Sequence, residues 1–395
     1  MLQTISQGRI SGSIPAIPSK SAAHRLYICA ALAEQPTEIS CQGTSKDIEA
    51  TKACLAAIRQ GETLLPCGES GSTLRFLLPV AAALGLEVDF RMEGRLPDRP
   101  LTPLDQQLAA HGVTLSRPVR HDLLHLSGQL RPGDYVLPGN VSSQYISGLL
   151  FALPLLPGTS TLTVTGKVES APYIAMTLDA LRQFGVEISR TGNVYTISGQ
   201  SYHSPGRAVV EGDWSNAAFW LCAGALSGPV TVTGLDPDSL QGDREVLDIL
   251  KRFGADTRQQ GTACTVSPGP LTATDIDAVA IPDLVPVLSV VAAAAKGTTR
   301  IYHAERLRIK ESDRLRTVSA MLQQLGAAVE ETADGLLIHG GRPLTGGTVD
   351  SANDHRIAMS AAVASVLCDV TVEGAEAVSK SYPRFWTDLN ILRSK

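Results

Sequence analysis

The sequence predicts a mixed α/β (α+β) protein with two lobes, each built from three copies of one repeating unit. At 395 residues the chain is too long for a single core of ordinary size. An apolar helix pattern, rich in small residues, occurs six times along the chain. A second helix pattern and short β-branched runs accompany each occurrence, so six units divide naturally into three and three.

The first helix of each unit is apolar nearly all round, which predicts that it is buried. The starts of these helices are spaced by about 70 residues, apart from a first gap of about 50. Many have Ser, Thr, Asp or Asn at or before the first turn, as ordinary N-caps do. The six segments are residues 21–32, 72–84, 143–156, 216–226, 285–295 and 356–366.

The second helix of each unit has one polar face and is expected on the outside, over the sheets. A glycine usually closes it, as in a left-handed C-cap. The segments are residues 47–61, 103–112, 174–185, 244–254, 314–326 and a truncated last one at 384–392.

Short alternating or β-branched runs lie before or after the second helices and predict strands. We expect the chain to cross between the lobes near residues 210–213, and we expect the functional site in a cleft between the lobes. The runs are residues 113–115, 160–164, 186–188, 195–197, 230–233 and 336–338.

Composition excludes several classes of protein. The formal net charge of −5 argues against a general nucleic-acid or membrane-surface binder, so cationic clusters are expected to bind small anions. Seven scattered cysteines form no C-x-x-C pair, which predicts buried thiols in a reducing compartment. The N-terminus lacks a basic start followed by an apolar run, and residues 284–295 are too short to span a bilayer. We therefore expect a cytoplasmic protein without membrane contact.

Cations lie in the first turns of several apolar helices, at Lys20, Arg25, Arg75 and Arg356. Capping does not explain them, because a cation at a helix N-terminus opposes the helix dipole and needs a compensating anion. A bound phosphate or carboxylate would supply one, held also by free backbone N–H groups.

The segment 306–316 has five cations and two carboxylates within eleven residues. On a continuous helix, Lys310 and Arg314 would lie one turn apart with Glu311 beside them. Such a cluster suits an anion that must be held while a proton moves. The alternative is a solvated face of salt bridges.

Other candidates give weaker indications. The Gly68-x-x-Gly71 turn is neither a Walker loop nor a dinucleotide fingerprint, and it suits close approach of the backbone to an anion. Asp283 precedes the fifth apolar helix and is either a plain N-cap or a base facing the cleft. His121 and His125 lack the glutamate of a zinc motif, so we expect no metal site. Cys67 is expected to be a buried thiol and not a nucleophile.

Seven motifs in order make the chain resemble the 5-enolpyruvylshikimate-3-phosphate (EPSP) synthase family from about residue 8 to about residue 386. They are S-K-S-x-x-x-R at 19–25, G-x-S-G-S-T-x-R at 68–75, R-L-P-D-R-P-L at 95–101, S-S-Q-Y at 142–145, E-S-x-P-Y at 169–173, R-I-K-E-S-D-R at 308–314 and N-D-H-R-I-A-M at 353–359.

The resemblance implies a two-lobed inside-out barrel of six βαβαββ repeats, three per lobe, with the active site in the interlobe cleft. One lobe would comprise residues 13–211 and bind shikimate 3-phosphate. The other would comprise residues 1–12 and 212–395 and hold phosphoenolpyruvate and the catalytic carboxylates. The implied reaction transfers the carboxyvinyl group of phosphoenolpyruvate to the 5-hydroxyl of shikimate 3-phosphate. The family uses no cofactor, works as a monomer and is inhibited by glyphosate.

The resemblance also implies roles for individual residues. Asp283 would accept the hydroxyl proton, Glu311 would protonate the methylene carbon, and Lys20 would assist the departure of phosphate. Phosphoenolpyruvate would be bound by Lys20, Gly71, Arg99, Gln144, Arg314, Arg356 and Lys380. Shikimate 3-phosphate would be bound by Lys20, Ser21, Arg25, Ser142, Ser143, Gln144, Ser170, Asp283 and Lys310.

Three positions depart from the family pattern. Glu69 replaces a common asparagine, Phe76 replaces a common proline, and Arg306 replaces an asparagine of some members. The related UDP-N-acetylglucosamine enolpyruvyl transferases have a K-N-A motif and a cysteine-bearing lid loop. In this chain Ser21 follows Lys20 in place of the K-N-A motif, and no such lid loop surrounds Cys67. The alternatives to the EPSP synthase activity are enolpyruvyl transfer to UDP-N-acetylglucosamine, a non-catalytic anion-binding protein and a nucleic-acid-binding protein.

Overall fold

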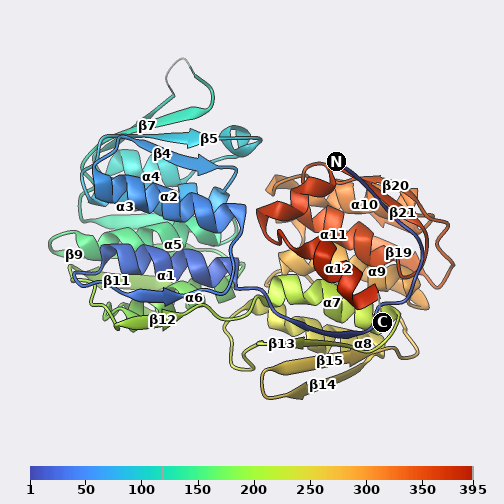
Figure 1. Ribbon diagram of the computed structural model, residues 1–395. Coiled ribbons are helices and arrows are strands. Elements are labelled where there is room, and N and C mark those ends of the chain that lie inside the picture. Colours follow the sequence, from blue (N-terminus) through green and yellow to red (C-terminus); the bar gives the residue numbers. More distant parts are fainter. Residues whose placement is uncertain (118–119, 394–395) are drawn as a thin grey trace. The chain divides into compact units, whose positions relative to one another are not determined.

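The computed structural model describes residues 1–117 and 120–393 and divides into two compact units. Unit 1 comprises Met1–Ser19 and Glu211–Lys395, and unit 2 comprises Lys20–Val210 (Figure 1). The expected boundary at residue 13 differs from this division. Strand β2 (Gly12–Pro15) pairs in parallel with β13 (Val230–Thr233), which holds the segment before Lys20 in unit 1.

The described residues of unit 2 form three sheets, and two of them share one strand order. In β4-β5-β7-β6 and in β8-β9-β11-β10, the first two strands are parallel and the remaining neighbours are antiparallel. In the third sheet, β3 and β12 pair in parallel. The strands are β3 (Glu38–Ser40), β4 (Leu64–Gly68), β5 (Val88–Met92), β6 (Val113–Ser116), β7 (Leu123–Gly128), β8 (Asp134–Pro138), β9 (Thr159–Thr165), β10 (Ser189–Thr191), β11 (Val194–Ser198) and β12 (Arg207–Val209).

The helices of unit 2 pack on one another, and the three expected to be buried are buried. Helices α3 and α5 are in contact, as are α5 with α6 and α1 with both α2 and α6. Figure 1 shows them stacked between the strands of this unit. The helices are α1 (Lys20–Leu32), α2 (Lys46–Gln60), α3 (Gly71–Ala83), α4 (Leu104–Ala110), α5 (Ser143–Ala152) and α6 (Ala171–Gln183), with short 3-10 turns at Leu96–Asp98 and Leu153–Leu155.

Within residues 1–19 and 211–393, unit 1 also has three sheets, and two repeat the order seen in unit 2. They are β2-β13-β15-β14 and β16-β17-β19-β18, and the third is β1-β21-β20. The N-terminal strands β1 and β2 therefore complete two sheets made mostly of later residues. The remaining strands are β1 (Leu2–Ile5), β14 (Asp256–Gln260), β15 (Ala263–Ser267), β16 (Ile276–Asp277), β17 (Gly297–Tyr302), β18 (Ala328–Glu331), β19 (Leu336–Gly340), β20 (Gly347–Asp350) and β21 (Val370–Glu373).

The apolar helices of unit 1 form its core, as their composition predicts. Helices α7, α9 and α11 contact one another, and nearly all of their residues are buried. The helices are α7 (Trp214–Leu226), α8 (Val246–Phe253), α9 (Val285–Ala294), α10 (Arg314–Gln324), α11 (His355–Ala364) and α12 (Phe385–Arg393), with 3-10 helices η3 (Gly242–Glu245), η4 (Pro282–Leu284), η5 (Glu305–Ile309) and η6 (Ala375–Lys380).

Each unit thus has its own apolar core, and the two sets of core residues do not overlap. The predicted glycine caps are present where α2 ends at Gly61 (φ 72°) and α8 ends at Gly254 (φ 105°). In the described part of the chain, every helix is too short or too polar to cross a membrane.

Candidate active site

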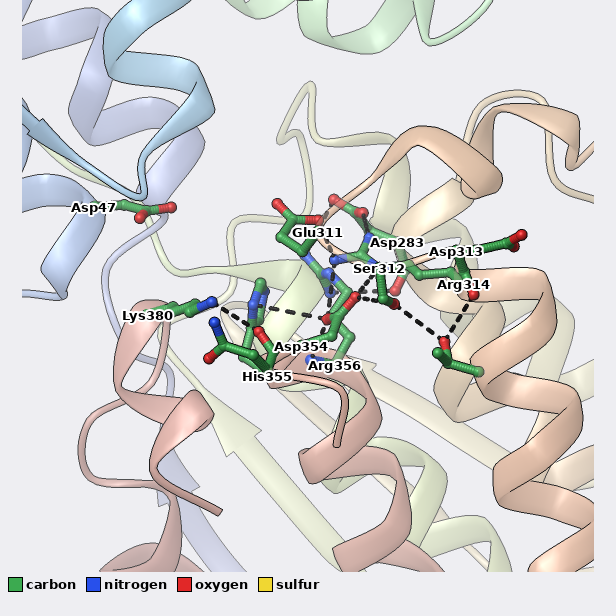
Figure 2. Close-up of polar contacts among 12 residues, drawn as sticks. Asp47, Asp283, Glu311, Ser312, Asp313, Arg314, Asp354, His355, Arg356 and Lys380 are labelled. Atoms are coloured by element: carbon green, nitrogen blue, oxygen red, sulfur yellow. Dashed lines mark hydrogen bonds and ion pairs between the residues drawn. The ribbon is translucent and has the colours of Figure 1, made fainter. Parts of the chain in front are cut away.

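Arg314 lies at the centre of a buried charge cluster in unit 1. Its side chain is 1% exposed, and its guanidinium forms ion pairs with Asp283 (2.7 Å), Glu311 (2.7 Å) and Asp354 (2.8 Å). Figure 2 shows the three carboxylates converging on this one cation. Burial alone lowers the pKa of Arg314, but the carboxylates outweigh it and raise the pKa above its usual value. The alternative interpretation, in which these charges form salt bridges on a solvent-exposed face, is therefore excluded for Arg314.

The prediction of a continuous helix across residues 306–316 is wrong. A 3-10 helix, η5, ends at Ile309, Lys310 has extended backbone angles (φ −82°, ψ −156°), and α10 begins only at Arg314. The Asp313 carboxylate accepts a hydrogen bond from the Arg316 N–H at 3.2 Å, which caps the new helix. The break places Glu311 in a non-helical turn before α10, from which it reaches Arg314.

Asp283 is not an N-cap. It lies inside η4, and α9 begins after Leu284, which provides no side-chain cap. Its carboxylate instead accepts from Arg314 and forms an ion pair of 3.1 Å with Arg356. Burial raises the pKa of Asp283, but Arg356, Lys310 and Arg314 outweigh it and hold the pKa well below its usual range. Asp283 is therefore an ionised carboxylate at neutral pH.

Lys310 is a partly buried cation with a lowered pKa. Burial lowers its pKa to about 8, with Arg306 and Arg314 acting in the same direction and Asp283 opposing them. An ammonium group with this pKa can lose its proton near neutral pH, whereas the guanidinium of Arg314 cannot. The cluster therefore combines permanent cations with one that can exchange protons.

Asp354 is a member of this cluster that the sequence reasoning missed. It caps α11 by accepting from the Arg356 N–H at 2.9 Å, and it also accepts from Arg314 and from the Ser312 hydroxyl at 3.0 Å. Burial raises the pKa of Asp354, while Arg314 and His355 lower it, and the net shift is downward. Its place in the N-D-H-R motif was visible in the sequence, but its contact with Arg314 was not.

Two further groups complete the unit 1 cluster. The Lys380 ammonium, at the end of η6, donates to the Asn353 carbonyl at 2.7 Å (Figure 2). Asp243, in η3, is fully buried and accepts from the Ser215 hydroxyl. Burial and the nearby Asp283 raise the pKa of Asp243 to about 7, although Arg356 lowers it. Asp243 was also missed, since nothing in its sequence surroundings marks it.

In unit 2, the first turns of α1 hold Lys20 and Arg25. Lys20 forms a 2.8 Å ion pair with Asp47, and both side chains are largely buried. Arg25 donates to the Thr177 hydroxyl at 2.9 Å and to the carbonyls of Ser21 (2.6 Å) and Tyr173 (2.8 Å). All three acceptors are neutral, so its charge is not cancelled by them. Burial lowers the pKa of Arg25 to about 10, which still leaves it cationic.

A second cationic group surrounds the start of α3. Arg75 donates to the Gln144 side-chain oxygen at 2.9 Å, and the Gln144 amide donates to the Ser72 hydroxyl at 2.9 Å. A Cβ atom on Gly71 would lie 2.6 Å from a terminal nitrogen of Arg75 and 2.7 Å from one of Arg99. Both guanidinium groups therefore approach the helix start closely, and glycine leaves the space for them.

The remaining predicted residues of unit 2 lie at the starts of α1, α5 and α6. Ser142 caps α5 by accepting from the Gln144 N–H at 3.3 Å, and Ser143 is buried in the first turn. Ser170 precedes α6 with a positive φ of 54°, which is strained for a residue other than glycine. Ser21 follows Lys20 in α1. These serines lie at helix N-termini, where hydroxyl and N–H donors suit a phosphate.

In the part of the chain that the structure describes, no group of three or more His, Cys, Asp or Glu side chains is placed to hold a metal ion. His121 pairs with Asp98 on the surface, and His125 pairs with Asp89 at 2.9 Å. Cys67 is buried, and burial raises its pKa well above the usual value, so it is not an activated nucleophile.

The structure therefore defines a mixed α/β protein with buried cation–carboxylate clusters suited to small anionic substrates. A family model described as EPSP synthase (3-phosphoshikimate 1-carboxyvinyltransferase) matches residues 5–62 and 56–389. A protein of Clostridium acetobutylicum named 3-phosphoshikimate 1-carboxyvinyltransferase is 43% identical over an alignment of 413 residues, covering 97% of this chain and 95% of that protein. One of the same name from Brachyspira hyodysenteriae is 39% identical and covers 96% of both chains.

Solved structures show the same fold. EPSP synthase from Acinetobacter baumannii matches with a TM-score of 0.80 at 24% identity, over 99% of this chain and 98% of that chain. The enolpyruvyl transferase NikO from Streptomyces tendae matches with a TM-score of 0.78 at 20% identity, over 99% and 97%. The chain belongs to the EPSP synthase family.

Proposed function

We propose that this protein transfers the carboxyvinyl group of phosphoenolpyruvate to the 5-hydroxyl of shikimate 3-phosphate, in the shikimate pathway of aromatic amino-acid biosynthesis. The observation that carries this function is whole-chain similarity of about 40% identity to relatives named 3-phosphoshikimate 1-carboxyvinyltransferase. The products are 5-enolpyruvylshikimate 3-phosphate and phosphate. The Arg314 cluster supports the proposal, because it combines buried cations with ionised carboxylates.

The finer architecture belongs to the same proposal. In the part of the chain that the structure describes, each unit has three sheets, and four of these six sheets share one strand order. This repetition supports two inside-out barrels of three βαβαββ repeats each. Unit 2 would then be the shikimate 3-phosphate lobe, and unit 1 the lobe that carries the catalytic carboxylates.

Shikimate 3-phosphate would be held mainly by unit 2. Arg25 suits its phosphate, because the three acceptors of its guanidinium are neutral and leave a net positive charge. Asp283 would accept from its hydroxyl groups. The proposed binding residues are Lys20, Ser21, Arg25, Ser142, Ser143, Gln144, Ser170, Asp283 and Lys310.

Phosphoenolpyruvate would be held by cations of both units. Developing negative charge is best stabilised by donors that are already in place before the reaction. Arg314 and Arg356 meet this condition, since ion pairs with buried carboxylates fix both guanidinium groups. The proposed binding residues are Lys20, Gly71, Arg99, Gln144, Arg314, Arg356 and Lys380.

The proton steps would be divided between two carboxyl groups. The hydroxyl oxygen adds to C2 of phosphoenolpyruvate while Asp283 takes its proton and Glu311 protonates the methylene C3. Loss of phosphate, assisted by Lys20, and of a proton from C3 then restores the double bond. An anion bound to Arg314 and Arg356 offsets the positive field that lowers the Asp283 pKa, so the substrate itself would strengthen the base.

Phosphate release from phosphoenolpyruvate, with either shikimate 3-phosphate or UDP-N-acetylglucosamine as acceptor, tests the function. We expect release only with the shikimate ester, and loss of at least about a hundredfold in kcat for Asp283→Ala and Glu311→Ala. Glu331→Ala is the matched control, because Glu331 pairs with Arg308 outside the cluster. Release only with the nucleotide sugar would overturn the substrate, and silence with both would favour a non-catalytic anion-binding protein.

Further properties follow from the proposed function. Glyphosate should inhibit turnover in competition with phosphoenolpyruvate, and lack of inhibition at millimolar concentrations would contradict this. We also propose that the enzyme works as a monomer in the cytoplasm and needs no cofactor or nucleic acid. Analytical ultracentrifugation of the active protein tests the monomeric state, and full turnover after exhaustive dialysis against chelator tests the independence of a cofactor.

A further inference from the structure

Helices α1 and α2 of unit 2 are joined by two polar contacts with the same spacing on both helices. Lys20 pairs with Asp47 at 2.8 Å, and the His24 Nδ1 atom lies 2.7 Å from the Thr51 hydroxyl oxygen. Each helix contributes residues four apart, which lie on one face one turn from each other. The second contact therefore repeats the first one turn deeper in the unit.

The second contact continues into a third helix. The Thr51 hydroxyl lies 2.6 Å from that of Thr73, and Thr73 donates to the Ser70 hydroxyl at 2.7 Å. Ser70 is the N-cap of α3, where it also accepts from the Thr73 N–H at 3.3 Å. The side chains of His24, Thr51, Thr73 and Ser70 are all buried, at 1%, 0%, 0% and 1% exposure.

The direction of these hydrogen bonds determines whether the Nδ1 atom of His24 donates or accepts. Each hydroxyl has one proton to donate. Because Thr73 gives its proton to Ser70, Thr51 must donate to Thr73 and accept from His24. The Nδ1 atom of His24 therefore carries a proton and donates it. Burial, followed by the nearby Lys20 and Arg25, lowers the pKa of His24 well below its usual value, which agrees with a neutral ring.

We propose that His24, Thr51, Thr73 and Ser70 form a positioning relay that fixes the first turn of α1, with Lys20, against the start of α3, with Gly71. This inference rests on the proposed function, in which Lys20 and Gly71 both contact phosphoenolpyruvate. The two helices come from different repeats of unit 2, and the buried Thr51 of α2 connects them.

The relay predicts different effects on the two substrates. Arg25, on the same helix as Lys20, is held by Thr177 and Tyr173 and not by the relay. Breaking the relay should therefore disturb the phosphoenolpyruvate contacts at the starts of α1 and α3 more than the contacts around Arg25. A general loss of stability would instead lower the amount of active enzyme and leave both KM values unchanged.

Thr51→Val tests the relay, because valine keeps the shape of threonine and removes its hydroxyl. We expect KM for phosphoenolpyruvate to rise about tenfold, and kcat and KM for shikimate 3-phosphate to change less than about threefold. Thr51→Ser keeps the hydroxyl and should restore the wild-type KM. Cys54→Ala is the matched control: Cys54 is buried on the same helix three residues later, and its loss leaves a cavity but no broken relay.

A wild-type KM for phosphoenolpyruvate in folded Thr51→Val, or an equal rise in Cys54→Ala, would overturn the proposal. If Thr51→Val does not fold by circular dichroism, Thr73→Val breaks the next hydrogen bond and takes its place with the same expected result.

A second measurement does not depend on turnover. Side-chain ¹⁵N NMR of the wild-type protein should show His24 as the neutral Nδ1–H tautomer, assigned by loss of its signals in His24→Asn. The pattern should change in Thr51→Val and not in Cys54→Ala. An Nε2–H tautomer in the wild type would overturn the relay. Wild-type protein that releases no phosphate would overturn the proposed function, while the tautomer would still decide the relay.

Discussion

Replacement of Arg314 by lysine should destabilise unit 1 far more than the same replacement at the surface. The Arg314 guanidinium pairs with Asp283, Glu311 and Asp354 and is 1% exposed. A lysine ammonium is a compact charge on a flexible stem and cannot match the planar fork that reaches three carboxylates. At least one carboxylate would remain buried without its partner.

The size of the effect follows from the burial of the cluster. Leaving one member of a buried ion pair without its partner costs about 3–5 kcal/mol, whereas an exposed pair contributes about 0–1 kcal/mol. Arg308 provides the matched control, because it pairs with Glu331 and Asp313 but its side chain is 33% exposed. Arg308→Lys should therefore cost about 1 kcal/mol or less.

Urea denaturation followed by tryptophan fluorescence measures this difference directly. All three tryptophans, at positions 214, 220 and 386, lie in unit 1, so the signal reports on the unit that carries both arginines. The cost of Arg314→Lys should shrink as the pH falls toward 4, because an unpaired carboxylate can then take up a proton. Equal losses for the two variants, or a loss that does not depend on pH, would refute the reasoning.

Three further predictions concern single residues. Gly71→Ala should raise KM for phosphoenolpyruvate at least about tenfold in steady-state assays, because the new Cβ would displace the guanidinium groups of Arg75 and Arg99. Arg25→Lys should raise KM for shikimate 3-phosphate at least about tenfold with little change for phosphoenolpyruvate, since lysine cannot reproduce its three hydrogen bonds. Burial and Asp283 raise the pKa of Asp243 to about 7, so the folded state binds more protons than the unfolded state between about pH 4 and 7. Wild-type stability should therefore fall relative to Asp243→Asn as the pH rises through this window, by at most about 1.4 kcal/mol per pH unit, and urea titrations at pH 5 and 8 that show no such trend would contradict the pKa.

The repeating pattern of helices could be predicted from the sequence because it depends on local composition. A segment such as residues 285–295 is apolar on every side, and such a helix is stable only when buried. Glycine after an amphipathic helix likewise reflects a local backbone requirement, as at Gly61. Both features are confirmed.

The spacing of residues along the sequence predicted the wrong structure where two local preferences competed. Residues 306–316 contain good helix formers, and their charges fit a single helix. Asp313 prefers to cap a helix rather than continue one, and the chain breaks before Arg314. The same break positions Glu311, so the error in the helix prediction lies at the centre of the site.

By itself, the sequence determined the class of fold, the family and most of the charged residues proposed for the site. These follow from patterns within single helices and from motifs of a few residues. The tertiary structure decided which charges meet. Asp354 contacts Arg314 from 40 residues away, and Asp47 contacts Lys20 from 27 residues away. Nothing local to either residue encodes its partner, because ion pairs between separate elements depend on how those elements pack.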